Sequence, residues 1–300
     1  MPDPDDVKPD TGPGAPPLPS AGPLPGRPGA RLLPGGPVAA AVLDEVAARV
    51  AALRRRGIRP ALATVLVGDD DASAGYIRIK QRQAAELGFA APHEHLPATA
   101  TQADLRAVIT DLSADPAVHG LLVQHPVPPH LDYDRALWAM DPDKDVDGMH
   151  PANVGRLALG LPGPVPCTPA GIEALLAHHR VPVSGREVVI LGRGVTLGRP
   201  LALLLAQKRP TANAAVTVVH TGVPDWPRYT RRAEVLIAAA GVPGIVRPEH
   251  VRPGAVVIGA ITPRVGGVGP VTVAMLLRNA VASADGQPSP GHPTSLGVWK

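Results

Sequence analysis

Ser73, Tyr76 and Lys80 follow one another at spacings of three and four residues. If this stretch is helical, the three side chains lie along one face of the helix. A tyrosine and a lysine placed in this way can transfer protons, because burial lowers the pKa of a lysine toward neutrality. The alternative is an exposed lysine beside a half-buried tyrosine on an ordinary helix, and the spacing taken alone favours that alternative.

Gln124 ends an apolar run that begins at residue 120, and it precedes Pro126 and Pro128. If the run is a strand, the Gln124 amide stands at the carboxyl edge of a sheet, where ligands of open α/β folds bind. In that place the amide can orient a lysine or a bound water. We interpret His125 as a local structural residue. The other histidines show no metal-ligand spacing, so we predict no metal site.

A dense charged stretch lies between residues 141 and 151, where Lys144, Asp145, Asp147 and His150 follow one another closely. Glycine and proline interrupt it, which is typical of a loop. Loops held on rigid scaffolds are where binding residues gather. A solvated linker between two domains explains the stretch equally well when it is taken alone.

A glycine-rich turn at Gly192, Gly194 and Gly198 follows an apolar run and precedes a predicted helix. Glycines let the backbone approach a pyrophosphate, and the helix N-terminus offers free N–H groups with a partial positive charge. The spacing is one residue longer than the usual dinucleotide fingerprint. A plain strand-to-helix turn is therefore the alternative interpretation.

The end of the next predicted strand indicates which dinucleotide would bind. A site specific for NAD usually has an acidic residue there to hold the ribose hydroxyls, but this chain has His220 and Thr221. Arg193 in the glycine-rich turn suits a 2′-phosphate better than a free ribose. These residues favour NADP as the cofactor.

The elements that must position these residues alternate between strand and helix. Apolar periodicity and glycine stops set their expected limits. We expect helices over residues 38–56, 73–87, 101–113, 168–180 (with Thr168 as a possible cap), 197–207 and 271–282, and strands over residues 61–67, 120–124, 187–192, 215–220, 235–240 and 255–258. The alternation predicts an α/β protein with parallel sheets, the second of them a Rossmann-type doubly wound sheet.

Composition narrows the classes of protein that fit. The chain has 300 residues, a net charge of +3 and few aromatic residues, so its core must be aliphatic. Basic residues are not interleaved with aromatic ones, so nucleic acid is not an expected partner. There is neither a signal peptide nor an apolar run near the ~20 residues of a membrane span. Cys167 is the only cysteine, which suits a reducing cytosol. We expect a soluble, cytoplasmic protein.

Together these motifs resemble the bifunctional methylenetetrahydrofolate dehydrogenase/methenyltetrahydrofolate cyclohydrolase family. The resemblance covers roughly residues 30 to 283, with the motifs in the family's order. The matching runs are Ser73-x-x-Tyr76-x-x-x-Lys80, Val123-Gln124-x-Pro126-x-Pro128, Lys144-Asp145-Val146-Asp147-Gly148 with His150-Pro151, Pro166-Cys167-Thr168-Pro169, the turn from Gly192 to Pro200, and Gly266-Gly267-Val268-Gly269-Pro270.

The resemblance implies two α/β domains flanking a cleft. Residues 30–149, completed by the helix 271–283, would form the folate-binding catalytic domain, and residues 150–270 the NADP-binding Rossmann domain. Residues 1–29, rich in proline and glycine, are expected to be a disordered tail because they offer little apolar surface to bury. Residues 284–300 are expected to be a flexible tail.

The resemblance also implies residue roles and two reactions on tetrahydrofolate derivatives. Lys80 would be the central catalytic residue, Gln124 would hold it together with a water, and Tyr76 would pack on the folate and share in proton handling. The first reaction oxidises 5,10-methylenetetrahydrofolate with NADP. The second hydrolyses the methenyl product to 10-formyltetrahydrofolate. The family is typically a homodimer.

The remaining implied roles concern substrate binding. Asp147 would hold the pterin ring, because a carboxylate accepts two parallel N–H bonds. Ser73 would lie in the same cleft, and Gly266 and Gly267 would bring backbone close to the folate.

Three departures from the family pattern stand out. Gly194 replaces the usual serine in the phosphate turn, and Arg264 interrupts the usual Pro-Val-Pro run before the last helix. After the strand that ends at Ile258, about 25 residues of the family pattern are missing. That segment helps to frame the nicotinamide pocket.

The departures leave alternatives to the bifunctional enzyme. One is a cyclohydrolase with weak or no dehydrogenase activity, and another is a non-catalytic folate- or nucleotide-binding paralogue. A generic NADP dehydrogenase of small acids fits least, since it leaves the charged loop unexplained.

Overall fold

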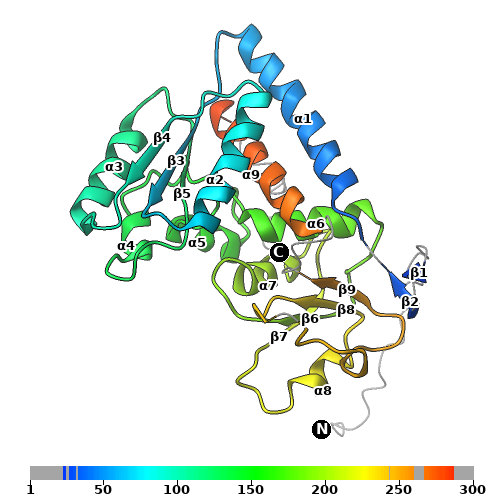
Figure 1. The fold of residues 1–300 in the computed structure, drawn as a ribbon. Coiled ribbons are helices and arrows are strands. Elements are labelled where there is room, and N and C mark those ends of the chain that lie inside the picture. Colours follow the sequence, from blue (N-terminus) through cyan, green and yellow to red (C-terminus); the bar gives the residue numbers. More distant parts are fainter. Residues whose placement is uncertain (1–22, 25–26, 32, 243, 260–266, 287–300) are drawn as a thin grey trace, which may run out of the picture.

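The computed structural model describes residues 23–24, 27–31, 33–242, 244–259 and 267–286 (Figure 1). Its helices and strands alternate along two parallel sheets. The elements are β1 Pro23–Leu24, β2 Arg27–Arg31, α1 Gly36–Arg55, β3 Leu62–Val67, α2 Asp71–Glu86, β4 His93–Leu96, α3 Gln102–Ala114, β5 Gly120–Val123, α4 Tyr133–Leu137, α5 Pro151–Leu159, α6 Cys167–His178, β6 Glu187–Leu191, α7 Gly198–Leu205, β7 Ala215–Val219, α8 Trp226–Thr230, β8 Val235–Ala238, the 3-10 turn Pro248–His250, β9 Val256–Gly259 and α9 Val268–Ala284.

The first sheet has the strand order β4-β3-β5 and the second has the order β7-β6-β8-β9. All the pairings within these two sheets are parallel. In each sheet the chain runs from its first strand to one neighbour and later to the other, so the order reverses at β3 and at β6. Ligands of open α/β sheets bind beyond the carboxyl ends of the strands at such a reversal. The predicted fold class is confirmed.

The inner strands of each sheet are buried on both faces, as is typical of parallel sheets, whereas the edge strands β4 and β7 are partly exposed. On β3, Leu62 joins a large core shared with α1, α2, α6 and α9, whereas Ala63 and Val65 face a second core under α3 and α4. On β6, Val188 and Ile190 join the same large core, which therefore spans both sheets. Figure 1 shows α1 and α9 side by side next to the first sheet, with α6 at the end of α9 above the second sheet. This shared core fixes one sheet relative to the other.

Local signals explain where the helices of the first half begin and end. Asp70 caps α2 by accepting a hydrogen bond from the Ser73 amide at 2.7 Å, and Gly88 ends the helix region with φ of 89°. Thr101 and Asp104 form a capping box at the start of α3. Glycine at positive φ costs little because it has no Cβ.

None of the described helices is both long and apolar enough to cross a membrane.

Some elements differ from the sequence-based expectations. β4 was not predicted, because its sequence His-Glu-His-Leu carries no apolar alternation; it is an exposed edge strand. α5 was not predicted, although Pro151 stands at its first position and His150 caps it. Thr168 is not the cap of α6, because the helix already begins at Cys167 after Pro166.

Part of the segment expected to be disordered forms regular backbone structure. β1 and β2 pair as a short antiparallel ladder, and β2 contacts β9. A ladder is held by backbone hydrogen bonds and does not need the large apolar side chains that this segment lacks. The C-terminal tail predicted from residue 284 begins slightly later, because α9 runs to Ala284 and Asp285 caps it. The rest of both predicted tails lies outside the described residues, and the predicted domain boundary at residues 149 and 150 stays a prediction.

Candidate active site

Lys80 and Gln124 meet at the carboxyl edge of the first sheet. Lys80 lies on α2, which follows β3, and Gln124 directly follows β5. The Lys80 Nζ donates a hydrogen bond to Gln124 Oε1 at 3.0 Å, and the Gln124 Nε2 donates to the His125 carbonyl at 2.6 Å. Gln124 is buried. Its amide therefore has one orientation, with the oxygen toward the lysine.

Ser73 and Tyr76 precede Lys80 on the same helix and differ sharply in exposure. The Ser73 side chain is buried in the first turn of α2, whereas Tyr76 is 59% exposed. An exposed aromatic ring beside a lysine is free to stack on a flat ligand. The sequence therefore placed both residues on the lysine's helix, and the structure leaves Tyr76 open to a ligand.

Hydrogen bonds anchor the charged loop to β5 and to α5. The Leu121 amide donates to the Lys144 carbonyl at 2.7 Å, so the loop joins the sheet edge. Asp145 is buried and accepts hydrogen bonds from the His150 amide at 2.7 Å and from Asn153 Nδ2 at 2.9 Å. Burial raises the pKa of Asp145 to about 6, although these hydrogen bonds oppose the shift. Asp145 therefore stabilises the conformation of the charged loop.

Asp147 is half-buried, and its carboxylate interacts with the Cys167 side chain. Burial raises the pKa of the Cys167 thiol well above its usual value. The Asp147 carboxylate adds to this increase through its charge and a hydrogen bond, while the Lys80 ammonium opposes it. The loop carboxylate and the α2 lysine therefore both act on the same buried thiol, although 67 positions separate them in the chain.

The glycine-rich turn lies at the carboxyl end of β6, where the order of the second sheet reverses. Gly192 has φ of 138°, and a Cβ there would overlap the Ala239 carbonyl; a Cβ at Gly198 would overlap the Gly192 carbonyl. The N–H groups of residues 194–197 donate to no other described residue. Close backbone approach and free N–H groups at the start of α7 fit a pyrophosphate. The second half therefore has the features of a dinucleotide site.

The side chains predicted to select the cofactor are exposed. Arg193, Gly194 and Thr221 all lie on the surface around the turn. Arg193 makes no hydrogen bond or ion pair with another described residue, so its guanidinium is available to a phosphate. No atom lies within 4 Å of a Cβ built on Gly194, so the site has room for the serine hydroxyl that the family usually places there. The arrangement fits NADP.

Of the two glycines predicted to approach the folate, Gly266 lies outside the described residues. Gly267 directly precedes α9 and is partly buried. Nothing in the described residues places it against Lys80.

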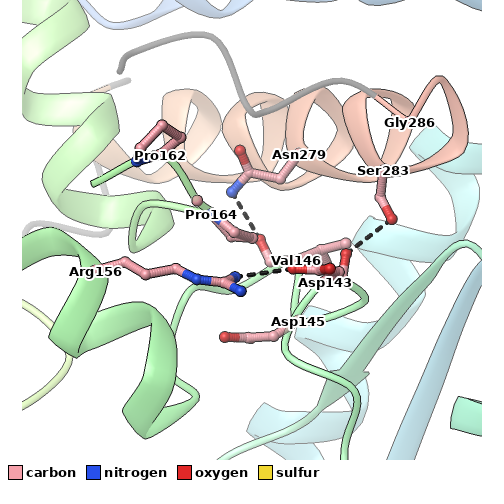
Figure 2. Close-up of a pocket in the computed structure, with 10 residues that line it drawn as sticks. Asp143, Asp145, Val146, Arg156, Pro162, Pro164, Asn279, Ser283 and Gly286 are labelled. Atoms are coloured by element: carbon pink, nitrogen blue, oxygen red, sulfur yellow. Dashed lines mark hydrogen bonds and ion pairs between the residues drawn. The ribbon is translucent and has the colours of Figure 1, made fainter. Parts of the chain in front are cut away.

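A pocket of about 320 Å³ lies behind the charged loop (Figure 2). Asp145, Val146 and Arg156 line it from the loop and α5, and Asn279 and Ser283 line it from α9. The pocket contains neither Lys80 nor Gln124. It therefore marks the supporting side of the loop and not the place where the predicted catalytic residues meet.

Two supporting asparagines were not singled out in the sequence. Asn153 joins Asp145 to the Pro142 carbonyl, and Asn279 joins α9 to the loop. The sequence does carry a signal for Asn279, because it is a polar residue within a long apolar helix. That signal identifies a buried polar group but not its partner.

The chain matches two family models in the order of its two sheets. Residues 33–147 match the catalytic domain of tetrahydrofolate dehydrogenase/cyclohydrolase. Residues 166–260 match the NAD(P)-binding domain of tetrahydrofolate dehydrogenase/cyclohydrolase.

Two relatives match over most of the chain. The bifunctional protein FolD 1 of Salinispora tropica is 73% identical over 278 positions, which cover 85% of this chain and 91% of the relative. The bifunctional protein FolD of Syntrophotalea carbinolica is 52% identical over 279 positions, which cover 85% of this chain and 96% of the relative. Since 85% of 300 residues is about 255, about two dozen positions of each alignment have no counterpart in this chain.

Solved structures agree with the fold. The bifunctional FolD methylenetetrahydrofolate dehydrogenase/cyclohydrolase of Campylobacter jejuni aligns with a TM-score of 0.81 at 37% identity, covering 86% of this chain and 99% of that one. The Trypanosoma brucei enzyme, solved with NADP and an inhibitor, aligns with a TM-score of 0.80 at 38% identity, covering 86% and 98%. The resemblance seen in the sequence is confirmed, and the chain belongs to the tetrahydrofolate dehydrogenase/cyclohydrolase family.

Proposed function

We propose that this protein oxidises 5,10-methylenetetrahydrofolate with NADP and hydrolyses the methenyl product to 10-formyltetrahydrofolate. The observation that carries the proposal is the contact of Lys80 Nζ with Gln124 Oε1 at 3.0 Å, at the sheet edge where ligands of this fold class bind. Membership of the family and the NADP-bound relative support both activities and the cofactor.

In the hydrolysis, Lys80 and Gln124 act on water and protons. Water adds to the methenyl carbon and loses both of its protons in turn: one is released to solvent, and the other is matched by the proton that the folate nitrogen gains as its bond to that carbon breaks and the formyl C=O forms. Lys80 is the group that relays these protons, because it contacts Gln124 at the sheet edge and its ammonium group can donate. Gln124 positions the lysine and can hold the water, since its own orientation is fixed by the His125 carbonyl.

Asp147 and Tyr76 bind the folate in this proposal. The two carboxylate oxygens of Asp147 accept N–H groups of the pterin, and charge makes such hydrogen bonds strong. The exposed ring of Tyr76 packs on the folate beside Lys80 and shares in proton handling. Ser73 lies one turn earlier on the same helix and shapes the end of the site. These four residues and Gln124 come from the first half of the chain.

In the oxidation, bound NADP supplies the hydride acceptor. Gly192, Gly194 and Gly198 let the backbone approach its pyrophosphate, and Arg193 with Thr221 holds the 2′-phosphate. The chain's task is then to hold two ligands in register, because alignment supplies much of the rate of such a transfer.

A cyclohydrolase with weak dehydrogenase activity is the second candidate. About two dozen positions of the relatives have no counterpart in this chain, and the match to the NAD(P)-binding model ends at residue 260. We place the missing segment after Ile258, beside the nicotinamide. A misplacement of about 1 Å there can cost roughly 10²-fold in rate.

One assay on the purified protein separates the candidates. The absorbance of methenyltetrahydrofolate is followed from methylenetetrahydrofolate with and without NADP, and then from methenyltetrahydrofolate alone. If methenyltetrahydrofolate forms from methylenetetrahydrofolate only when NADP is present, and if added methenyltetrahydrofolate is consumed without NADP, the protein is the bifunctional enzyme. Disappearance alone supports the second candidate, and the absence of both reactions contradicts the proposal. We also propose a homodimer in the cytoplasm, as the family resemblance and the single cysteine imply.

A further inference from the structure

Asn279 is a buried polar residue that joins α9 to the charged loop. Its side chain is 4% exposed, and its Nδ2 donates to the Val146 carbonyl at 2.9 Å and to the Val165 carbonyl at 3.2 Å. Figure 2 shows the amide pointing from α9 toward the loop. One amide group therefore links α9 to two segments that lie 133 and 114 residues earlier in the chain.

The same Val146 carbonyl accepts a second hydrogen bond. The Cys167 Sγ donates to it at 3.1 Å, and the Asn279 Nδ2 lies 3.7 Å from that sulfur. The carbonyl belongs to the peptide group that joins Val146 to Asp147. Its direction is therefore fixed from two sides, immediately before the residue that we assign to the pterin.

The backbone after Asp147 is fixed as well. Gly148 has φ of 69°, and a Cβ built there would lie 2.5 Å from the Pro166 nitrogen. The loop is thus pressed against the segment that precedes Cys167, with no space for an alternative path. The peptides on both sides of Asp147 have defined positions, and Asn279 determines the first of them.

We propose that Asn279 is a positioning residue for Asp147: by holding the Val146 carbonyl it sets the backbone from which the carboxylate reaches the folate. This inference rests on the proposed function, because the role of Asp147 belongs to it. Helix α9 then contributes to the folate site through a residue that does not touch the substrate.

The proposal has a physical basis in the cost of unpaired groups. Without the amide, the Val165 carbonyl loses its side-chain donor and the Val146 carbonyl keeps only the weaker thiol donor. A buried acceptor without a partner is unfavourable, so the loop shifts to find another donor or a water. A binding site needs its groups held within about 0.5 Å, so a shift of this kind weakens substrate binding.

A purely structural role for Asn279 makes a different prediction, and Ser283 provides the matched control. Ser283 lies one helical turn further along α9, and its hydroxyl, which has one proton to donate, is within hydrogen-bond distance of the carbonyls of Asp143 at 2.9 Å and His119 at 2.5 Å. It therefore ties the same helix to the same loop, but four residues before Asp147. If only the attachment of α9 mattered, Ser283→Ala and Asn279→Leu would affect folding and catalysis alike.

The test combines Asn279→Leu, Asp147→Ala and Ser283→Ala in kinetic cycles with methenyltetrahydrofolate. We expect Asn279→Leu to raise the KM about 3- to 10-fold with kcat within about twofold, as for one lost hydrogen bond. In the Asp147→Ala background the same change should raise KM no further, because residues that act through one another are not additive. Ser283→Ala should lower the melting temperature and leave KM unchanged.

Each outcome decides the matter. Additive effects of Asn279→Leu and Asp147→Ala on KM, or an equal rise of KM in Ser283→Ala, overturn the inference. An unchanged KM in Asp147→Ala contradicts the proposed function itself, and an unchanged KM in Asn279→Leu alone contradicts only the inference. If Asn279→Leu does not fold, Asn279→Ser takes its place in the same cycle, because its hydroxyl keeps one donor. A partial, non-additive rise of KM then supports the inference, and an additive one overturns it.

Discussion

Two of the residues assigned to the folate reactions, Lys80 and Gln124, are already in contact, whereas Arg193, Gly194 and Thr221, which are assigned to the nucleotide, are exposed. In the first half, Lys80 contacts Gln124 and the backbone around Asp147 is fixed on both sides. In the second half, Arg193 and Thr221 lie exposed. The folate side is organised before any ligand binds, and the nucleotide side offers donors that a ligand must bring together.

This difference matches what each reaction needs. Hydrolysis requires folate, water and a proton relay, all provided by the first half and by α9. Oxidation also requires the nicotinamide ring to be held against the folate, and the segment that we propose to be missing after Ile258 would lie beside that ring. We therefore expect changes in the first half to affect both reactions and changes in the turn to affect oxidation alone.

The largest expected effect comes from Lys80→Met, which keeps the length of the side chain but removes the amine. Cyclohydrolase activity should fall about 10²- to 10⁴-fold, with folate binding largely intact, because a proton-relaying group is lost. Lys144→Met is the matched control, since the Lys144 Nζ donates to the Asp115 carbonyl away from the site. Stopped-flow loss of methenyl absorbance measures both. Near wild-type activity in Lys80→Met would contradict the assignment of the relay.

Asp145 holds the charged loop in place, and its effect on the free energy of unfolding depends on pH. The pKa of Asp145 in the folded protein is about 6 against a usual value of 3.8, because burial disfavours the charge. The groups that face its carboxylate are Asn153, the amides of His150 and Met149, and Asp147. The folded state therefore binds the proton more tightly than the unfolded state. Proton binding by Asp145 therefore stabilises the folded state fully below pH 3.8, and this stabilisation is lost as the pH rises to about 6.

Asp145→Asn should remove that dependence. The free energy of unfolding of the parent protein should fall relative to the variant between pH 4 and 6, by on the order of 3 kcal/mol. Urea titrations at several pH values measure the two slopes. Parallel slopes for the two proteins would show that Asp145 is not the group that titrates.

Asp147→Ala should weaken both reactions through the folate. Loss of a charge-assisted pair costs about 1.5–3 kcal/mol, so the KM for either folate should rise about 10- to 150-fold. Binding of NADP alone, measured by calorimetry, should stay unchanged. A loss of NADP binding with normal folate binding would place the charged loop on the wrong side of the cleft.

Arg193→Ala tests the exposed side of the comparison. The preference for NADP over NAD should fall about tenfold, because the guanidinium is the best partner for the 2′-phosphate. Arg199→Ala is the control: this arginine lies exposed in the first turn of α7, so it should affect the two cofactors alike. An unchanged ratio in Arg193→Ala would leave Thr221 as the discriminating residue.

Much of this fold can be predicted from the chain, because buried parallel strands are continuous apolar runs. The strand at Leu62–Val67 and the helix that carries Lys80 were predicted within two residues at each end. β4 was not predicted, since a partly exposed edge strand can be polar. The prolines and glycines around α5 favoured a loop, although proline is well tolerated at a first helical position.

The site divides in the same way. Gln124 could be placed at the sheet edge, because strand ends and sheet order follow from local pattern and topology. The hydrogen bonds of Asn279 join residues 112 to 133 positions apart, and no local spacing encodes such partners. Sequence therefore predicts which residues stand at strand ends better than it predicts the long-range partners that hold them.

Gly194→Ser is the smallest change and tests whether the exposed turn can be improved. A Cβ at Gly194 meets nothing within 4 Å and its φ is not positive, so serine fits without strain. A hydroxyl added beside the phosphate should lower the KM for NADP about 2- to 5-fold, as for one modest hydrogen bond. Cyclohydrolase activity and the melting temperature should not change.

Gly192→Ser is the matched control for that variant. It introduces the same side chain two residues earlier, where φ is 138° and the Ala239 carbonyl occupies the space of the Cβ. It should therefore lower the melting temperature and the dehydrogenase activity together. If Gly194→Ser instead raised the KM for NADP, the turn would already fit its ligand closely without the hydroxyl. The exposed side of the molecule would then be as well adapted to its ligand as the folate side.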